Sequence, residues 1–212
     1  MVIKSIVIKL RDQYRNVLRR HFMKKKIEKL KNAEICLISS KCNGACILHD
    51  LGLEFKSPFV NLWIKPSDYI KMLKSLKYYM ECDLLETEEE GITYPVGILD
   101  DIKIYFQHYF SFEEAKRKWE ERKARMDYNN LYVLFADTDR CTEKDIMEFD
   151  NLPYKNKAVF VNKPRVDIKS AVYIRGFENE DGVGICVYYK GKLSYKKYYD
   201  DFDYVAWFNQ GK

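Results

Sequence analysis

The first 30 residues of the chain carry apolar side chains at helical spacing. These positions recur at steps of three to five residues, and neither glycine nor proline interrupts them. They are Val7, Leu10, Tyr14, Leu18, Phe22, Ile27 and Leu30. Such spacing places the side chains on one face of an α-helix, and the other faces are rich in lysine and arginine. The pattern predicts a basic amphipathic helix over residues 1–31.

Beyond residue 31, short apolar runs alternate with longer helical patterns. Strands are predicted at residues 34–39, 58–64, 83–86, 92–94, 102–108, 131–136, 158–161 and 172–174. Helices are predicted at residues 66–80 and 111–126, from residue 142 onward and at residues 201–208. For residues 182–199 the pattern does not choose between hairpin and helix. The alternation predicts one α/β domain at residues 32–212, with a central mixed or largely parallel sheet flanked by helices.

Three loops follow predicted strands at positions where α/β proteins bind ligands. In such sheets, ligands bind beyond the carboxyl ends of the strands. This rule selects the loops after residues 39, 108 and 136. The working site is therefore expected in these loops, with the basic helix preceding the domain that carries them.

Charge is distributed unevenly along the chain. Residues 1–31 carry eleven Lys and Arg against two acidic residues, a net charge of +9, whereas the remaining residues sum to −4. A positive arm implies an anionic partner, and the amphipathic pattern favours an anionic membrane surface. A helix packed on its own domain, with a solvated outer face, explains the pattern as well. No recognition motif accompanies the charge, so nucleic acid is not expected as a partner.

Composition indicates a folded protein of the cytoplasm. The chain has 212 residues, of which 47% are apolar, enough for one domain with a full hydrophobic core. No stretch approaches the roughly 20 apolar residues that span a bilayer, and no secretory signal is apparent. The six cysteines show no framework spacing. We expect them to be free thiols in a reducing cytosol.

The loop after residue 136 holds the first candidate residues. Asp137 and Asp139 lie two positions apart and could hold Mg²⁺ or Mn²⁺, which would neutralise a diphosphate on a donor. Arg140 could bind a phosphate oxygen. Acidic residues before a helix are also stabilised by the helix dipole without any metal. The short D-x-D pattern leaves both interpretations open.

The loop after residue 39 is the second candidate. Gly44 permits close approach of the backbone, and amide groups from Asn43 onward could bind an anion at the start of the next helix. Cys42 could act as a nucleophile if Lys41 and the helix start favoured its thiolate. A small buried thiol beside a turn glycine is the alternative interpretation.

His108 is the third candidate, at the end of the predicted strand 102–108. The alternating pattern places it on the side of Ile104 and Phe106. Its ordinary pKa suits general acid–base catalysis. A buried histidine that hydrogen-bonds a backbone carbonyl explains the same position.

The predicted helix 111–126 carries Trp119, Arg122 and Arg125, the fourth set of candidates. Arg122 shares a face with Trp119, and an arginine on an apolar face needs a partner because an unpaired buried charge is costly. A bound phosphate or an aspartate of the loop after residue 136 could be that partner. An internal ion pair between helix and sheet is the structural alternative.

In combination, these segments resemble a bacterial family of unknown function associated with exopolysaccharide biosynthesis, that is, with capsule and surface polysaccharide. The matching segments are residues 38–44, 50–53, 57–58, 94–97, 108–109, 137–142, 149–157 and 202–205, with Trp119, Arg122 and Arg125. The likeness covers nearly all of the chain after residue 32. The sequence departs from the family pattern at Ala45 and Arg140, where the family has glycine. The first departure makes the anion-binding loop less open.

The resemblance implies a role in making surface polysaccharide, and the candidate residues favour a transferase. The donor would be a nucleotide sugar or another phosphate-bearing molecule, and the acceptor would be a glycan. In this hypothesis the loop aspartates hold the metal, His108 is the base, the arginines at 122 and 125 bind phosphate, and the basic helix rests on the inner membrane face. A non-catalytic membrane-surface adaptor in the same pathway is the alternative. Acyl or phosphoryl transfer through Cys42 is a third possibility.

Overall fold

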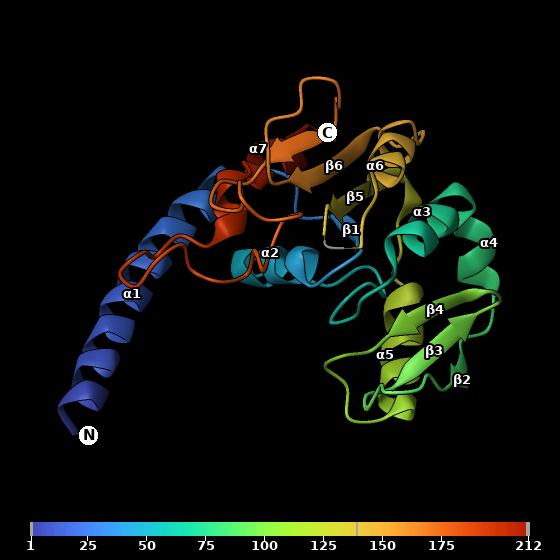
Figure 1. Ribbon diagram of the computed structural model, residues 1–212, viewed down its shortest axis with the longest axis horizontal. Coiled ribbons are helices and arrows are strands. Elements are labelled where there is room, and N and C mark those ends of the chain that lie inside the picture. Colours follow the sequence, from blue (N-terminus) through green and yellow to red (C-terminus); the bar gives the residue numbers. More distant parts are fainter. Residues whose placement is uncertain (1, 139, 211–212) are drawn as a thin grey trace.

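A four-stranded parallel sheet forms the centre of the protein. The computed structural model describes residues 2–138 and 140–210, with side chains from residue 8 onward. Strands β1, β5, β6 and β7 span Cys36–Ser39, Leu131–Ala136, Asn156–Val161 and Ala171–Tyr173. They lie in the order β1-β5-β6-β7, and every neighbouring pair is parallel (Figure 1). This arrangement confirms the predicted α/β class.

Helices cover both faces of the parallel sheet. Helices α2, α3, α6 and α7 span Asn43–Leu51, Pro66–Lys74, Glu143–Asp150 and Tyr204–Asn209. Tyr132 and Leu134 of β5 pack into one core with residues of α2 and α7, whereas Val133 and Phe135 pack into a second core with residues of α3 and α6. Because both faces are buried, β5 is a continuous apolar run rather than an alternating one.

A smaller antiparallel sheet lies beside the parallel one (Figure 1). Its strands β2, β3 and β4 span Leu85–Thr87, Val96–Leu99 and Ile102–Tyr105, with helices α4 at Leu76–Glu81 and α5 at Phe112–Lys123 before and after them. Ile102 and Ile104 of β4 belong to the same core cluster as Trp119 of α5 and Val133 of β5. The two sheets therefore share one hydrophobic core.

The strand predicted at residues 58–64 does not form. Pairing in this segment is limited to an isolated bridge between Trp63 and Tyr105. Asn61 has a φ of 59°, which is incompatible with an extended strand. Phe59 and Leu62 are buried, so the apolar run marks a buried loop.

Other predicted elements differ in extent. The helix expected at residues 66–80 breaks at Ser75, where φ is −137°, and the strand expected at 92–94 is replaced by β3 a few residues later. The strand expected at 102–108 ends at Tyr105, because the Tyr109 N–H donates to the Phe106 carbonyl at 3.1 Å and closes a turn. His108 lies in that turn. Residues 182–199 form no helix before the 3₁₀ helix at Tyr198–Asp201, and an isolated antiparallel bridge between Tyr189 and Lys197 gives part of the segment a hairpin-like pairing.

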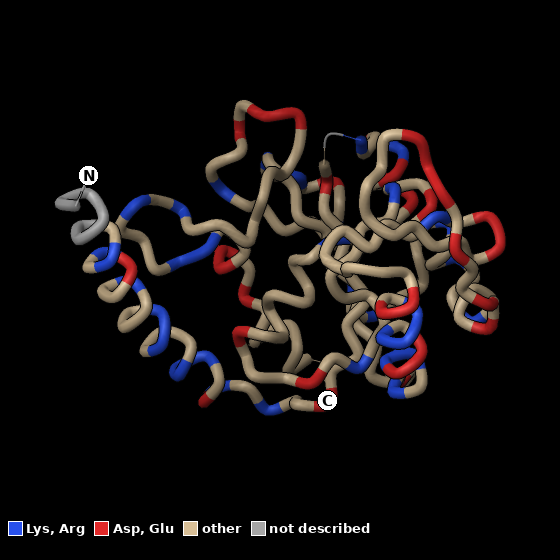
Figure 2. The backbone as a smooth tube through the Cα atoms, turned by 90° about the horizontal axis from the view of Figure 1, so that it is seen from below, with Lys and Arg blue, Asp and Glu red and all other residues tan. Residues whose placement is uncertain are grey.

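The predicted basic helix is present as α1, Val2–Lys29, and only its second half is docked. Arg19 and Met23 are buried against the body, whereas Leu10, Tyr14 and Val17 are each more than half exposed. In Figure 1 the first half projects away from the body, and Figure 2 shows Lys and Arg along the helix. No helix in the described part of the chain is long and apolar enough to cross a bilayer.

Candidate functional site

The carboxyl ends of β1 and β5 bring two of the predicted loops together. Ser39 of β1 is paired with Leu134 of β5, and the Ser40 N–H donates to the Leu134 carbonyl at 3.3 Å. The loops at residues 40–44 and 137–142 therefore lie side by side at one edge of the parallel sheet. The third predicted loop follows β4, which belongs to the antiparallel sheet. It is not part of this row of strand ends.

Gly44 allows the start of α2 to approach β1 closely. A Cβ atom at position 44 would lie 2.6 Å from the Cβ of Ser39, so no side chain fits there. The Gly44 amide donates to Ser39 Oγ at 3.4 Å, and Asn43 is buried. The sharp turn from strand to helix thus depends on glycine, and part of the amide set expected to bind an anion already has an internal acceptor.

Cys42 precedes α2 and is half-buried. Burial raises the pKa of its thiol, the neighbouring Cys46 raises it further, and Lys41 offsets these effects only in part. The condition for a nucleophilic Cys42, a thiolate favoured by Lys41 and the helix start, is therefore not met. Each of the six cysteines is a free thiol.

Asp137 begins the loop after β5 and is half-buried. Burial raises the pKa of its carboxyl to about 6, with a further contribution from Glu143, while a hydrogen bond from Cys141 and the charge of Arg165 oppose the rise. The Asp137 carbonyl accepts from the Val183 N–H at 2.7 Å, which fixes the loop from the other side. A carboxyl with such a pKa can exchange a proton near neutral pH.

Asp139, the second predicted metal ligand, lies outside the described residues. Among the described residues, no three His, Cys, Asp or Glu side chains gather as a cation site requires. Asp137 is thus the described residue that offers a hard oxygen ligand in this loop.

Arg140 lies over an aromatic ring that the sequence did not single out. Its guanidinium carbon is 5.3 Å from the centre of the Trp63 ring, close enough for a cation–π contact. Ile64, which follows Trp63 in the chain, donates its N–H to the Ser40 carbonyl at 3.3 Å. Trp63 therefore connects the loop after β5 to the loop after β1.

His108 does not occupy the position that its alternating pattern predicts. Ile104 and Phe106 are buried, but the strand has already ended and His108 is exposed in the turn. Its neighbour Tyr109 is directed inward, with its hydroxyl donating to the Val60 carbonyl at 3.0 Å. The period-two argument fails here because it assumes three further residues of strand, up to residue 108.

Arg122 and Tyr109 form the best-defined polar contact near these loops. Arg122 Nη1 donates to the Tyr109 hydroxyl at 2.7 Å, and its guanidinium lies 5.5 Å from the Phe55 ring. Burial raises the pKa of Tyr109 although Arg122 lowers it, and Glu114 and then Cys42 are near enough to add to the rise. Among the described side chains, no carboxylate forms an ion pair with Arg122. The guanidinium of Arg122 is therefore held by a neutral hydroxyl rather than by a carboxylate.

The other two candidates on α5 have structural roles. Trp119 is 1% exposed and packs edge-on against Phe59, with ring centres 5.5 Å apart. Its ring is part of the core, so a direct role of Trp119 in binding stays a prediction that this packing does not support. Arg125 forms an ion pair with Glu54 at 2.5 Å, so an acidic side chain already occupies its guanidinium.

We refer to Cys42, Trp63, Tyr109, Arg122, Asp137 and Arg140 as the carboxyl-edge site. Arg140 contacts Trp63, and the Ile64 N–H donates to Ser40. Tyr109 and Arg122 form a separate contact, with Cys42 near Tyr109. Trp63 and Tyr109 come from segments whose predicted secondary structure is wrong, which is why the sequence did not identify them.

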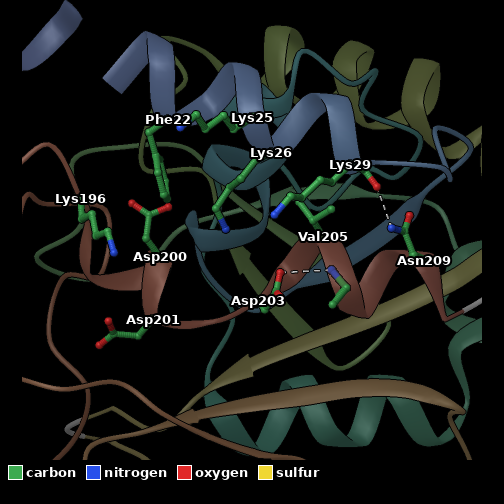
Figure 3. A pocket seen from close by; sticks show the side chains of 11 residues that line it. Phe22, Lys25, Lys26, Lys29, Lys196, Asp200, Asp201, Asp203, Val205 and Asn209 are labelled. Atoms are coloured by element: carbon green, nitrogen blue, oxygen red, sulfur yellow. Dashed lines mark hydrogen bonds between the residues drawn. The ribbon is translucent and has the colours of Figure 1, made fainter. Parts of the chain in front are cut away.

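Two surface cavities lie away from this site. One, of about 660 Å³, is at the amino ends of β5 and β6, opposite the edge where α/β sheets bind ligands. The other, of about 480 Å³, lies between α1 and the C-terminal segment (Figure 3).

The parallel sheet with polar loops at its carboxyl edge defines an α/β protein with a candidate site for an anionic ligand. The chain belongs to the family described as a domain of unknown function (DUF1919), which matches residues 13–209. The match extends from the middle of α1 through α7. The chain is also 46% identical over 195 residues to an uncharacterised protein of Haemophilus influenzae, covering 92% of this chain and 94% of that protein.

Proposed function

We propose that the protein is a transferase in the assembly of cell-surface polysaccharide, and that it uses a nucleotide sugar or another phosphate-bearing donor at the carboxyl-edge site. The observation that carries this proposal is Arg122, a half-buried guanidinium held by the Tyr109 hydroxyl without a carboxylate among the described side chains. A phosphate is the ligand that best completes such a geometry. The pathway is suggested by the resemblance to the exopolysaccharide-associated family.

In this proposal, Asp137 is the proton acceptor. A hydroxyl of the glycan acceptor attacks the donor carbon and gives its proton to the Asp137 carboxylate. The bond from that carbon to the phosphate oxygen breaks, and the phosphate leaves with its charge held by Arg122 and Arg140. Asp137 replaces His108 in this role because the imidazole is exposed in a turn.

A divalent cation is a second element of the proposal. Mg²⁺ or Mn²⁺ bound by the aspartates of the loop after β5 would neutralise a donor diphosphate. The variant Asp137→Asn separates the two roles of Asp137. If Asp137 is a metal ligand, the variant loses affinity for Mn²⁺. If Asp137 is the base, the variant loses turnover and keeps its affinity for Mn²⁺.

Isothermal titration of the purified protein with a panel of nucleotide sugars, with and without Mn²⁺, tests the binding. Arg122→Gln is expected to weaken donor binding by about tenfold or more. Arg125→Gln is the matched control, since Glu54 already pairs with this arginine on the same helix. Absence of any donor binding by the wild type, or equal affinities in Arg122→Gln and wild type, contradicts the proposal.

The proposal also places the domain at the cytoplasmic face of the membrane, with α1 on an anionic surface. The second candidate function, a non-catalytic adaptor at that surface, is favoured by the fully exposed side chain of Phe110. The adaptor predicts that removing residues 1–31 abolishes polysaccharide assembly in cells whereas Asp137→Asn and His108→Ala do not. The transferase predicts loss in Asp137→Asn.

A further inference from the structure

The cavity between α1 and the C-terminal segment is separate from the carboxyl-edge site. Helix α1 contributes Phe22, Lys25, Lys26 and Lys29, and the C-terminal segment contributes Lys196, Asp200, Asp201, Asp203, Val205, Ala206 and Asn209. In Figure 3 the lysine side chains of α1 reach over the cavity from one side, and the aspartates line the other. Its volume of about 480 Å³ is that of a small-ligand pocket.

The three aspartates of this cavity are occupied by internal partners. Asp200 is ion-paired with Arg19, and Asp201 is ion-paired with Lys190. Asp203 accepts from the Ala206 N–H at 3.2 Å as the cap of α7. The carboxylates therefore balance charges behind the cavity wall or satisfy backbone amides.

The lysines of the cavity lack such partners. Among the described side chains, no carboxylate lies within ion-pair distance of Lys25, Lys26, Lys29 or Lys196. Lys26 instead places its ammonium 3.7 Å from the centre of the Tyr204 ring. Burial lowers its pKa, the charges of Asp200 and Asp203 oppose this in part, and Arg19 and Lys196 add to the lowering. Four ammonium groups line the cavity against three carboxylates, and two of these carboxylates, Asp200 and Asp201, are already paired with Arg19 and Lys190, so an anion would offset the remaining repulsion.

An apolar stripe on α1 leads to the mouth of this cavity. Leu10, Tyr14 and Val17 are 59%, 56% and 62% exposed, and their spacing places them on one helical face. His21 and Lys25 continue the same face toward the cavity and are exposed. Lys9, Arg20 and Lys24 of the same helix are exposed, and Figure 2 shows Lys and Arg spread along it. An apolar stripe with basic flanks is the arrangement of helices that lie in a membrane interface.

We propose that this cavity binds the phosphate group of an anionic lipid while the stripe of Leu10, Tyr14 and Val17 lies in the membrane interface. The inference extends the membrane contact of the proposed function and does not depend on the chemistry of the carboxyl-edge site. A lipid satisfies both features at once, since its phosphate meets the lysines and its apolar part lies along the stripe. A soluble phosphate compound leaves the stripe exposed to water.

Flotation of the full-length protein with phospholipid vesicles tests the proposal. Phosphatidylcholine vesicles carry either phosphatidic acid or phosphatidylglycerol, matched for total negative charge. Because phosphatidic acid presents an uncovered phosphate monoester, we expect the wild type to bind these vesicles about tenfold more tightly. Pure phosphatidylcholine vesicles should bind little protein.

Two double variants separate the cavity from general electrostatic attraction. Lys25→Gln with Lys29→Gln removes two charges that line the cavity, and Arg20→Gln with Lys24→Gln removes two exposed charges of the same helix outside it. The second pair should weaken binding to both anionic vesicles by the same factor. The first pair should abolish the preference for phosphatidic acid. Circular dichroism verifies that both variants are folded.

Three results overturn the inference: no preference of the wild type for phosphatidic acid, an equal effect of both double variants, or saturable cavity-dependent binding of glycerol 3-phosphate without vesicle recruitment. Asp137→Asn serves as the control for the carboxyl-edge site and should bind vesicles as the wild type does. Loss of donor binding and loss of vesicle binding are therefore separate failures.

Discussion

At the scale of single residues, Asp137 stands out because its carboxyl has a pKa well above that of an ordinary aspartate. Its carboxyl follows a buried strand and faces Glu143, so ionisation costs more in the folded protein than in the unfolded chain. Proteins commonly retain such unfavourable groups where function requires them. The free energy of unfolding should therefore depend on the ionisation of this carboxyl.

We predict that Asp137→Asn stabilises the protein near neutral pH. The folded pKa of about 6 lies above the ordinary value of 3.8, so the wild type loses stability as pH rises between these values. The amide cannot ionise, and after allowance for solvent screening its gain should be about 1 kcal/mol above pH 6 and small near pH 4. Urea unfolding at several pH values in EDTA measures it. A gain independent of pH contradicts the explanation; Asp83→Asn, an exposed site, is the control.

At the scale of elements, α1 is held to the body through one buried arginine. Arg19 is 7% exposed and ion-paired with Asp50 of α2 and Asp200 of the C-terminal segment. Burial alone would lower the pKa of Arg19, but the two carboxylates raise it above its ordinary value. Hydrogen bonds from Tyr199 and Arg19 hold the pKa of Asp50 below its usual range although burial opposes this. The three charges therefore depend on one another.

Arg19→Met should destabilise the protein by about 3 kcal/mol, because it leaves two carboxylates without their shared cation. Thermal and urea unfolding measure the loss. Adding Asp50→Asn should recover part of it. The neighbouring Arg20 is exposed, and Arg20→Met should change stability by less than about 0.5 kcal/mol. Similar effects of the two single substitutions would show that the buried arginine does not hold the helix.

Prediction from the sequence succeeded for the helical period of α1 and for the apolar run of β5, and it failed for an apolar run that packs as a loop. The apolar run of β5 and the helical spacing of α1 each specify their element, and the loops after β1 and β5 were correctly placed after strands. Residues 58–64 are apolar because they pack as a loop, and no local pattern distinguishes that from a strand. Tyr109 was missed because the end of β4 is set by a turn. The ion pair of Arg125 could not be predicted because Glu54 is distant in sequence.

At the scale of the whole molecule, the first half of α1 stands outside the compact body. The hydrogen bonds from α1 side chains to other parts of the described chain begin at Arg15, which donates to the carbonyls of Gly191 and Lys192. The described side chains before it, at positions 8–14, therefore contribute little to the folded body. This separation makes the extension available for a partner.

Deletion of residues 2–13 should leave the melting temperature within about 2 °C of that of the full chain, since few contacts are lost. The same deletion removes Leu10 and the basic residues around it, so binding to anionic vesicles should fall sharply. Differential scanning fluorimetry and vesicle flotation on one preparation measure both quantities. A large drop in melting temperature would mean that the extension is part of the fold.

The segment from Gly182 to Asp200 contacts both the loop after β5 and helix α1. At one end Gly182 packs against the backbone of Thr138, at a distance that excludes any side chain, and Val183 bonds to Asp137. At the other end Tyr195 and Asp200 accept from Arg19. Where a ligand at the loop after β5 and a ligand of α1 both favour the same position of this segment, each raises the affinity for the other by the same factor. Ligand binding at α1 would then change with ligand binding at the loop after β5, because this one segment contacts both.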